Sequence, residues 1–410
     1  MNLTWVLAWR NLWRHRRRTW LTVGAMLFCN VLLVFLISLQ LGSYQVMIDN
    51  SLALFSGHLQ VQQADYRADQ RLRDTVPQVT ALAEEMRGQL DAVGVAARGQ
   101  AFALASSEER SFGIQITGVQ PAYEPLVSSL PGLVAQGRYL QPDDSDAIVV
   151  GAVLARNLRV APGDALTFIG SGRDGSIAAG IATVVGILDS GIPEVDRGMA
   201  QVPLAWFQDV FAMGEAGHAV VVRMAHLEQV QAAVATTRGL LPAEENLAVL
   251  DWDALQPGLR QAIQSDMASA WFMYAVLILL VAFSVLNTQL MSVMERTHEF
   301  GVMLALGLGP GRLARLVAME TMLLSLLGLA LGLLCGALLV AYLSVAGFTY
   351  PGMEELAARF NMAGRIYPEF SVVALTWGPL VVFVFCLLAA IYPALSLFRL
   401  APVSAMRAAR

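Results

Sequence analysis

Lysine is absent from this sequence: all 27 basic residues among its 410 residues are arginine. A phosphate-binding P-loop requires a lysine that reaches the β- and γ-phosphates of a nucleotide. The absence therefore excludes a standard P-loop ATPase from this chain.

Charge is also scarce. Only 14% of the residues are charged, whereas 56% are hydrophobic. This balance is too apolar for an ordinary soluble protein and is typical of an integral membrane protein. A domain that binds nucleic acid through a basic surface is not expected.

Cysteine is limited to Cys29, Cys335 and Cys386, which all lie inside apolar runs. The long segment between the first two runs contains none, so no disulfide framework holds it. We expect the three thiols to pack as small apolar groups.

Signatures of catalysis and of metal binding are missing as well. His58, His218 and His226 are dispersed without metal-ligand spacing, and no nucleophile motif of the form G-x-S-x-G occurs. The sequence GSGRDG at 170–175 fits a dinucleotide loop, but a strand-like run follows it where such a loop requires a helix. We predict a hairpin turn there, no enzyme activity, and neither a catalytic residue nor a metal site.

Four apolar runs reach the roughly 20 residues that a transmembrane helix needs. They are Thr19 to the first charge at Asp49, Met267–Met294, Thr321–Met353 and Phe370–Phe398. The first run is too long for the apolar core of a signal peptide, so we interpret it as a permanent anchor.

Arginine marks the side on which the ends of the runs lie. The segments before the first run, between the second and third, and after the fourth are rich in arginine, which predicts that they are cytoplasmic. The segment from Asp49 to Asp266 holds 14 arginines and 26 acidic residues, a net charge of 14 − 26 = −12. Four spans with both termini inside place this segment outside.

The predicted fold class is a membrane protein with four transmembrane α-helices and a large α+β extracytoplasmic (periplasmic) domain between helices 1 and 2. Strand-like runs occur at 58–63, 112–119, 147–150, 165–170, 181–188 and 218–224, and helix-like runs at 78–90, 152–158, 203–211 and 225–239. The predicted parts are a cytoplasmic amphipathic helix (1–18), transmembrane helix 1 with a stalk (19–48), the periplasmic domain (49–266), transmembrane helix 2 (267–294), a cytoplasmic helix and turn (295–309), transmembrane helix 3 (310–346), a periplasmic loop (347–369), transmembrane helix 4 (370–398) and a cytoplasmic tail (399–410).

The N-terminal segment is predicted to lie on the membrane surface. Trp5, Trp9 and Trp13 recur every four residues and form one aromatic stripe, with Arg10, Arg14 and Arg17 on the adjacent face. Such a helix lies in the headgroup plane and pairs with anionic lipid. The alternative is that this segment only flanks the first transmembrane helix and sets its orientation in the membrane.

The third run carries Gly328, Gly332 and Gly336 at four-residue spacing. Three glycines on one helix face allow another backbone to approach closely, which predicts helix packing there. The sequence leaves open whether the partner is a helix of this chain or of a second chain. Glu320, close to this stripe, is expected to pair with Arg312 and Arg315 or with a neighbouring helix end.

The segment 294–313 interrupts two apolar runs. Glu295, Arg296 and Glu299 precede the apolar sequence FGVMLALG, and Gly307 and Pro310 fit a helix end and a helix start. We expect a short cytoplasmic helix that docks a separate ATPase.

A family resemblance joins these features. The stretch ERTHEFGVMLALGLGPGRLARLVAMETMLLSLLGLALG and the tail YPALSLFRLAPVSAMR resemble the FtsX-like permease domain of ABC transporters, and AWRNLWRHRRRTWLT resembles the N-terminal helix of that family. The stretch ITGVQPAYEPLVSSLPGLVAQGRYLQPDDSDAIVVGAVLARNLRVAPGDALTF resembles the external domain of lipoprotein-releasing LolC/LolE permeases, and related domains occur in MacB-type exporters. The positions that match the coupling motif are Glu295, Arg296, Glu299, Gly301, Ala305 and Gly307.

The resemblance implies a non-catalytic permease subunit in the bacterial inner membrane. Two permease chains, identical or homologous, would bind two ATPase subunits, which hold ATP and Mg, and a periplasmic carrier or adaptor would act outside. ATP-driven motion of the ATPase would move the external domain and extract lipoproteins or other lipid-anchored cargo. The alternatives are an efflux permease of the MacB type and an FtsX-like transmitter that activates a cell-wall hydrolase.

Overall fold

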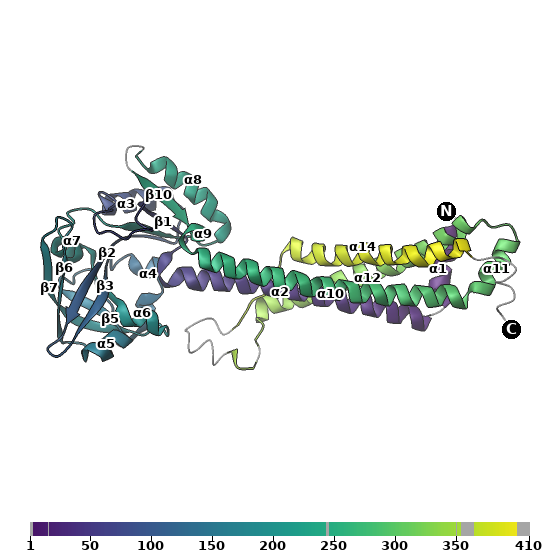
Figure 1. Cartoon of the computed structure of the whole chain (residues 1–410), viewed down its shortest axis with the longest axis horizontal. Coiled ribbons are helices and arrows are strands. Elements are labelled where there is room, and N and C mark those ends of the chain that lie inside the picture. The colour runs from purple at the N-terminus through teal and green to yellow at the C-terminus, as the bar shows by residue number, and fades with distance from the viewer. Residues whose placement is uncertain (1–2, 15, 243–245, 350, 354–364, 400–410) are drawn as a thin grey trace. The chain divides into compact units, whose positions relative to one another are not determined.

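The computed structural model describes residues 3–14, 16–242, 246–349, 351–353 and 365–399. These residues form two compact units. The helical unit contains the chain up to Val46 and most of the chain from Ala262 onward, and the sheet unit contains Met47–Gln261. The boundary between the units falls within the long helices α2 and α10 (Figure 1).

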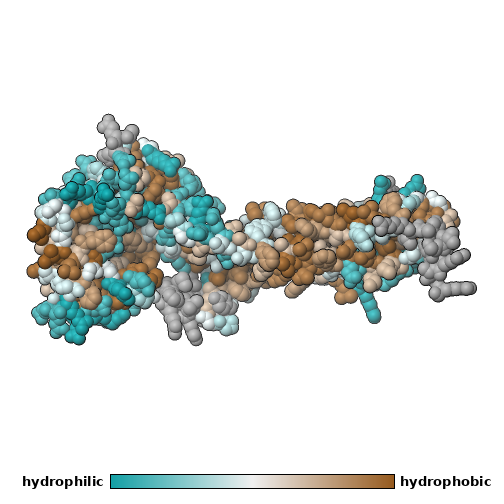
Figure 2. Space-filling view, in the orientation of Figure 1, coloured by the Kyte–Doolittle hydropathy of each residue, from teal (hydrophilic) through white to brown (hydrophobic). Residues whose placement is uncertain are grey.

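Four helices of the described chain are long and apolar enough to cross a membrane, which confirms the predicted class. Figure 2 shows hydrophobic side chains over most of their surface and hydrophilic ones toward the end where α1 and α11 lie. The helices that belong wholly or partly to the helical unit are α1 (Leu3–Arg14), α2 (Arg16–Ser51), α10 (Pro257–Glu295), α11 (Thr297–Ala305), α12 (Pro310–Ala346) and α14 (Val372–Ser396), followed by the short helix η4 (Leu397–Arg399).

The sheet unit is built on one sheet with the strand order β10-β1-β9-β2-β3-β8-β5-β7-β4, in which β6 pairs with β2 and β7. Most pairs are antiparallel, and the parallel pairs β3–β8 and β5–β7 give the unit its mixed character. The strands are β1 (Leu59–Gln63), β2 (Gly94–Ser106), β3 (Ser111–Val119), β4 (Val134–Gly137), β5 (Ala147–Gly151), β6 (Ala165–Ser171), β7 (Ile177–Leu188), β8 (Met199–Pro203), β9 (Ala219–Arg223) and β10 (Leu247–Asp251).

Short helices pack on the sheet and complete the α+β unit. The π-helix η1 (Leu52–Ser56) continues α2. The others are α3 (Val79–Gln89), α4 (Glu124–Val127), η2 (Leu130–Leu133), α5 (Ala152–Leu158), α6 (Pro193–Gly198), α7 (Leu204–Val210), η3 (Leu227–Gln229), α8 (Val230–Leu240) and α9 (Trp252–Leu255).

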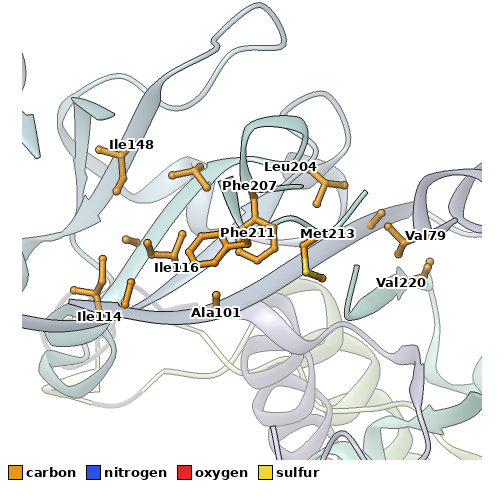
Figure 3. Close-up of a cluster of buried hydrophobic side chains, with 14 of the residues drawn as sticks. Val79, Ala101, Ile114, Ile116, Ile148, Leu204, Phe207, Phe211, Met213 and Val220 are labelled. Carbon is orange, nitrogen blue, oxygen red and sulfur yellow. The ribbon is translucent and has the colours of Figure 1, made fainter. Parts of the chain in front are cut away.

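The centre of the sheet unit is a buried aromatic cluster. Phe207 and Phe211 lie with ring centroids 4.7 Å apart, among aliphatic side chains from several strands (Figure 3). Gly99 and Gly118 are paired across β2 and β3, and a Cβ at Gly118 would lie 2.5 Å from Phe207. Both strands therefore have glycine where the Phe207 ring approaches the backbone.

Several predicted boundaries differ from the structure. The helix expected over residues 1–18 ends at Arg14. Arg16–Arg18 belong instead to the start of α2, since arginine is a good helix former and continues the helix of the first apolar run. The run 225–239 begins with a 3₁₀ turn, and α8 starts at Val230. Strands β2, β4, β8 and β10 were not predicted. Residues 354–364 of the predicted loop and 400–410 of the predicted tail lie outside the described residues.

The predicted hairpin turn is present. Strands β6 and β7 pair antiparallel from Ala165↔Thr183 to Ser171↔Ile177, and the sequence GSGRDG lies at the turn between them. No helix follows this glycine-rich stretch, so it lacks the geometry of a dinucleotide site.

Candidate functional site

The segment 296–310 forms a short helix and a tight turn at one end of the helical unit (Figure 1). Helix α11 ends in a Schellman motif: the Leu308 N–H donates to the Met303 carbonyl at 3.1 Å, and the Gly307 N–H donates to the Leu304 carbonyl at 3.0 Å. Gly307 has φ +93°, which favours glycine. Pro310 then begins α12.

One face of α11 packs on the chain and the other is exposed. Phe300 and Gly301 are buried, and Phe300 packs with α10 and α12 residues. His298, Val302 and Ala305 recur at helical spacing on the exposed side, and Leu306 is 77% exposed. The exposed face of this segment is therefore mainly apolar, and of the predicted coupling residues only Ala305 lies on the exposed side of the helix itself.

Arg296 is buried within the helical unit, whereas a residue that contacts a docked partner directly would be exposed. Its side chain is 8% exposed, and its Nη1 donates to both carboxylate oxygens of Glu320 at 3.0 and 3.1 Å. The Asn11 amide donates to the same carboxylate at 2.6 Å. Glu320 thus pairs with Arg296 and not with Arg312 or Arg315, which are exposed on α12 itself.

The two predicted acids lie at the edge of this buried pair. Glu299 contacts Arg14 at 3.2 Å and the Arg296 Nε at 3.3 Å, while Glu295 accepts from Arg18 at 3.1 Å. These contacts tie α1 and the start of α2 to the α10–α11 junction. Both acids keep exposed surface, but exposed ion pairs contribute little stability.

Helix α1 packs through aliphatic side chains and leaves its tryptophans exposed. Ala8 and Leu12 are buried against α12. Trp5, Trp9 and Trp13 are 38, 49 and 38% exposed, and Trp9 and Trp13 lie edge to face. Exposed tryptophan and arginine side chains thus occur together on α1, the composition predicted for a helix at a lipid headgroup layer.

The glycine stripe of α12 faces α2 of the same chain. A Cβ at Gly328, Gly332 or Gly336 would lie 2.7, 2.5 or 3.1 Å from a side chain of α2. Those side chains, Met26, Asn30 and Val34, have the same four-residue spacing. The partner left open by the sequence is therefore the first long helix.

A groove between α2, α10 and α14 was not predicted. It has a volume of about 470 Å³ and is largely apolar. Trp271 and Trp377 lie edge to face on one side, with ring centroids 5.1 Å apart. The residues that line it are Ile37, Gln40, Leu41, Tyr44, Met267, Trp271, Tyr274, Val373 and Trp377.

A polar cluster closes one part of this groove. Asp266 accepts hydrogen bonds from the Tyr44 hydroxyl at 2.6 Å and the Gln40 amide at 3.0 Å. The Gln40 carbonyl accepts from the Tyr274 hydroxyl at 2.6 Å. The groove therefore has aromatic and aliphatic walls, and one carboxylate is held beside it by two of its lining residues, the arrangement that an amphiphile fits. Its residues come from three helices, and those of α2 lie more than 200 positions from those of α10, so only polar side chains in apolar runs could have signalled it.

Within the sheet unit, the end of the α2–η1 helix is held by donors. The Leu52 and Ala53 carbonyls accept from the backbone N–H groups of Gly57 and Ser129, at 2.8 and 2.7 Å. The next three carbonyls accept from side chains: Leu54 from Ser128, Phe55 from Arg98 and Ser56 from Gln60. Five consecutive helix-end carbonyls are thus satisfied without water.

Arg98 is the centre of this arrangement, which we name the helix clamp (Arg98, Glu124, Ser128 and Ser129). Arg98 and Glu124 are 1 and 0% exposed, and they are joined by two hydrogen bonds of 3.1 and 2.6 Å. The guanidinium also lies 4.4 Å from the centre of the Phe55 ring. Sequence reasoning missed this pair because Arg98 and Glu124 are 26 positions apart and only the fold brings them together.

Comparison with known proteins identifies two regions of the chain. Residues 19–240 match the family described as the MacB-like periplasmic core domain, and residues 271–402 match the FtsX-like permease C-terminal family. The first match covers the region from α2 to α8. The second covers most of α10 and the whole of α11, α12 and α14.

Curated relatives include two proteins named lipoprotein-releasing system transmembrane protein LolC. The one from Neisseria meningitidis serogroup B is 26% identical over 238 residues, which are 55% of this chain and 56% of the relative. The one from Xylella fastidiosa strain 9a5c is 25% identical over 320 residues, 73% of this chain and 74% of the relative. The chain thus spans just over half the length of the Neisseria relative.

Solved structures with similarity to part of the chain include two external domains. The extracellular domain of the noncanonic ABC-type transporter YknZ has a TM-score of 0.36 and 18% identity, and it covers 48% of this chain and 100% of that domain. The periplasmic region of MacB from Actinobacillus actinomycetemcomitans has a TM-score of 0.37 and 13% identity, covering 51% of this chain and 94% of that one.

Proposed function

This chain belongs to the family of the MacB-like periplasmic core domain, and we propose that it is the non-catalytic permease subunit of an ABC transporter that extracts lipid-anchored cargo from the bacterial inner membrane. It carries an FtsX-like permease region and is similar to LolC proteins. In this proposal ATP is bound and hydrolysed by a separate subunit, both termini are cytoplasmic, and the sheet unit is periplasmic. A second permease chain, identical or homologous, completes the transporter.

The observation that supports ATPase docking best is the exposed apolar face of α11. His298, Val302 and Ala305 lie on a short helix, with Leu306 directly after it, and the other face of this helix is fixed by Phe300 and by the Arg296–Glu320 pair. A rigid helix with an apolar outer face fits a groove on a soluble partner. The docking surface in our proposal is this face, and Arg296 supports it from within the chain.

The groove at Trp271 and Trp377 supports an amphiphilic cargo. Tryptophan is enriched where a membrane meets water, so these side chains are suited to the interfacial level of the membrane. A lipid chain could enter the groove from the bilayer without crossing it. This is the property that an extraction mechanism requires.

A second apolar surface, on the sheet unit, supports a soluble partner of the carrier or adaptor type. Leu104 and Ile169 are paired across β2 and β6 and are 49 and 55% exposed. Phe102, Ile177 and Ile181 on β2 and β7 are 64, 81 and 65% exposed. Contiguous exposed apolar side chains on a sheet are typical of an interaction surface.

The docking proposal is tested by purifying the full-length chain with its native partners. Wild-type protein is expected to recover ATPase activity together with a chain that contains a Walker A lysine. Leu306→Asp should lower that recovery by about tenfold, because it places a charge at the centre of an apolar contact. Val93→Asp, at an exposed apolar position of the sheet unit, should leave it unchanged. Equal recovery in both variants contradicts docking through α11.

A further inference from the structure

A negative charge that the chain itself does not neutralise lies beside the groove between α2, α10 and α14, on Asp266, which accepts from two residues that line it. Asp266 is exposed, and both of its side-chain donors, Tyr44 and Gln40, are neutral. Among the described residues, no arginine or histidine lies within 4.0 Å of its carboxylate. By contrast, Glu299 and Glu320 of the same helical unit each have an arginine at salt-bridge distance.

The hydrogen bonds fix this carboxylate beside the groove. Tyr44 and Gln40 both line the groove and both donate to Asp266, while Met267, the next residue of α10, also lines it. Gln40 is itself oriented by Tyr274. A charged group held by oriented neutral donors recognises a ligand charge at little cost in side-chain entropy.

The neighbouring side chains favour a positive ligand charge as well. Tyr44, Trp271, Tyr274 and Trp377 line the groove, and aromatic rings attract an ammonium group. A phosphate or carboxylate placed beside Asp266 would instead meet a like charge. Aliphatic residues such as Ile37, Leu41 and Val373 line the rest of the groove and suit an acyl chain.

We propose that this groove binds an acylated amphiphile whose head carries an ammonium group, with the chain among the aromatic and aliphatic side chains and the ammonium at Asp266. The inference rests on the proposed function in that it names the cargo class of that transporter. The recognition chemistry itself needs no ATPase. An amine-bearing phospholipid and a lipopeptide with a free N-terminal amine share this chemistry, and the two are separated by experiment.

The test uses the full-length chain with a photo-crosslinking amino acid, benzoylphenylalanine, in place of Val373, which lines the groove and is 63% exposed. The protein is placed in nanodiscs that contain equal amounts of phosphatidylethanolamine and phosphatidylglycerol with the same acyl chains. Cross-linked lipids are then identified by mass spectrometry. The expected ratio favours phosphatidylethanolamine by about threefold to fivefold, the factor that a solvent-accessible ion pair supplies.

Asp266→Asn should bring this ratio back to the bulk composition, because it keeps the shape and removes the charge. Asp91→Asn, at an exposed acid of the sheet unit, should keep the wild-type ratio. No cross-linked lipid at all, or the same enrichment in Asp266→Asn, would overturn the proposal. A wild-type ratio equal to the bulk would exclude phosphatidylethanolamine as the occupant.

A second arm separates the two sources of the amine and needs no variant at position 266. A synthetic diacyl lipopeptide, with its N-terminal amine either free or acetylated, competes with the phospholipids for the cross-link. Stronger competition by the free amine supports a lipopeptide cargo, whereas phosphatidylethanolamine enrichment with equal competition by both peptides assigns the groove to phospholipid. If neither phosphatidylethanolamine nor the free amine is preferred, the proposal fails. No ATPase is present, so such a failure leaves ATPase docking through α11 untouched.

Discussion

Gly332 decides at a single position how closely α12 can approach α2. Its missing side chain leaves room for Asn30, whose Cβ would lie only 2.5 Å from an added methyl group. A methyl group added at Gly24, on α2, would have no neighbouring atom within 4 Å. Gly332 is therefore a close-contact position between two helices and Gly24 is not, although both lie in apolar helices.

We expect Gly332→Ala to lower the free energy of unfolding by roughly 1–3 kcal/mol, because the helices must separate or distort. Gly24→Ala should be neutral or slightly stabilising, since alanine has the higher helix propensity. Thermal unfolding of the full-length chain in detergent measures both changes. Similar melting temperatures for the two variants would remove the packing role of Gly332.

His218 is fully buried in the sheet unit and remains neutral at neutral pH. Its Nδ1 accepts from the Gln100 N–H at 2.9 Å, and its Nε2 lies 3.2 Å from the Leu72 carbonyl. Burial lowers the pKa of His218 from 6.5 to about 4. Between these two values the unfolded chain takes up a proton that the folded chain does not, so stability falls as the pH falls from about 6.5 to about 4.

The His218→Gln variant should therefore lose part of the acid sensitivity of the sheet unit. The wild-type loss through this residue is about 3 kcal/mol across that pH window. Unfolding is followed at pH 7 and at pH 4.5 by near-ultraviolet circular dichroism. His226→Gln, at an exposed histidine, should keep the wild-type dependence. An unchanged dependence in His218→Gln would contradict the linkage.

Among the elements, those with strong local patterns were predictable from sequence and those fixed by long-range pairing were not. The runs at 147–150 and 152–158 correspond to β5 and α5 because buried aliphatic residues and helix formers agree there. Strand β2, GVAARGQAFALAS, contains one β-branched residue and favours a strand only once β3, β6 and β9 pair with it.

The candidate site divides in the same way. The α11 segment and its glycine turn were visible in the sequence because capping residues act locally. The burial of Arg296 was not, because it depends on Glu320 and Asn11, which come from two other helices. The groove and the helix clamp likewise join residues that only the fold brings together.

The helix clamp yields a prediction at the scale of elements. Arg98→Met leaves Glu124 buried and uncompensated, and it should lower the free energy of unfolding by roughly 3–5 kcal/mol. The double variant Arg98→Met/Glu124→Leu should recover part of this loss. A deficit of roughly 1–3 kcal/mol should remain, because the Phe55 carbonyl loses its donor.

Chemical unfolding of the full-length chain provides these free energies. Arg87→Met is the control for removing a partly buried arginine that donates to a strand carbonyl, that of Val95, and not to the α2–η1 helix. If the double variant is as unstable as Arg98→Met, the uncompensated Glu124 charge is not the cause of the loss.

For the whole molecule, α10 is the covalent route between α11 and the sheet unit, and α2 connects α1 to the sheet unit. Helix α10 runs without interruption from Pro257 to Glu295, directly before α11. Its 39 residues correspond to roughly 58 Å at 1.5 Å per residue, about twice the 30 Å hydrocarbon core of a bilayer. We propose that motion of the ATPase passes along this helix and α2 to the sheet unit.

The most direct test of this mechanism inserts Gly-Gly-Ser after Gln261, where α10 passes from one compact unit to the other. The variant is reconstituted in proteoliposomes with the ATPase that co-purifies with the chain, and ATP hydrolysis and ATP-dependent release of a diacyl lipopeptide are measured separately. Glycine frays a helix at about 1 kcal/mol per position, so the insertion should uncouple the two ends. Our account predicts wild-type hydrolysis with release lost; wild-type release from the inserted chain would contradict transmission through α10.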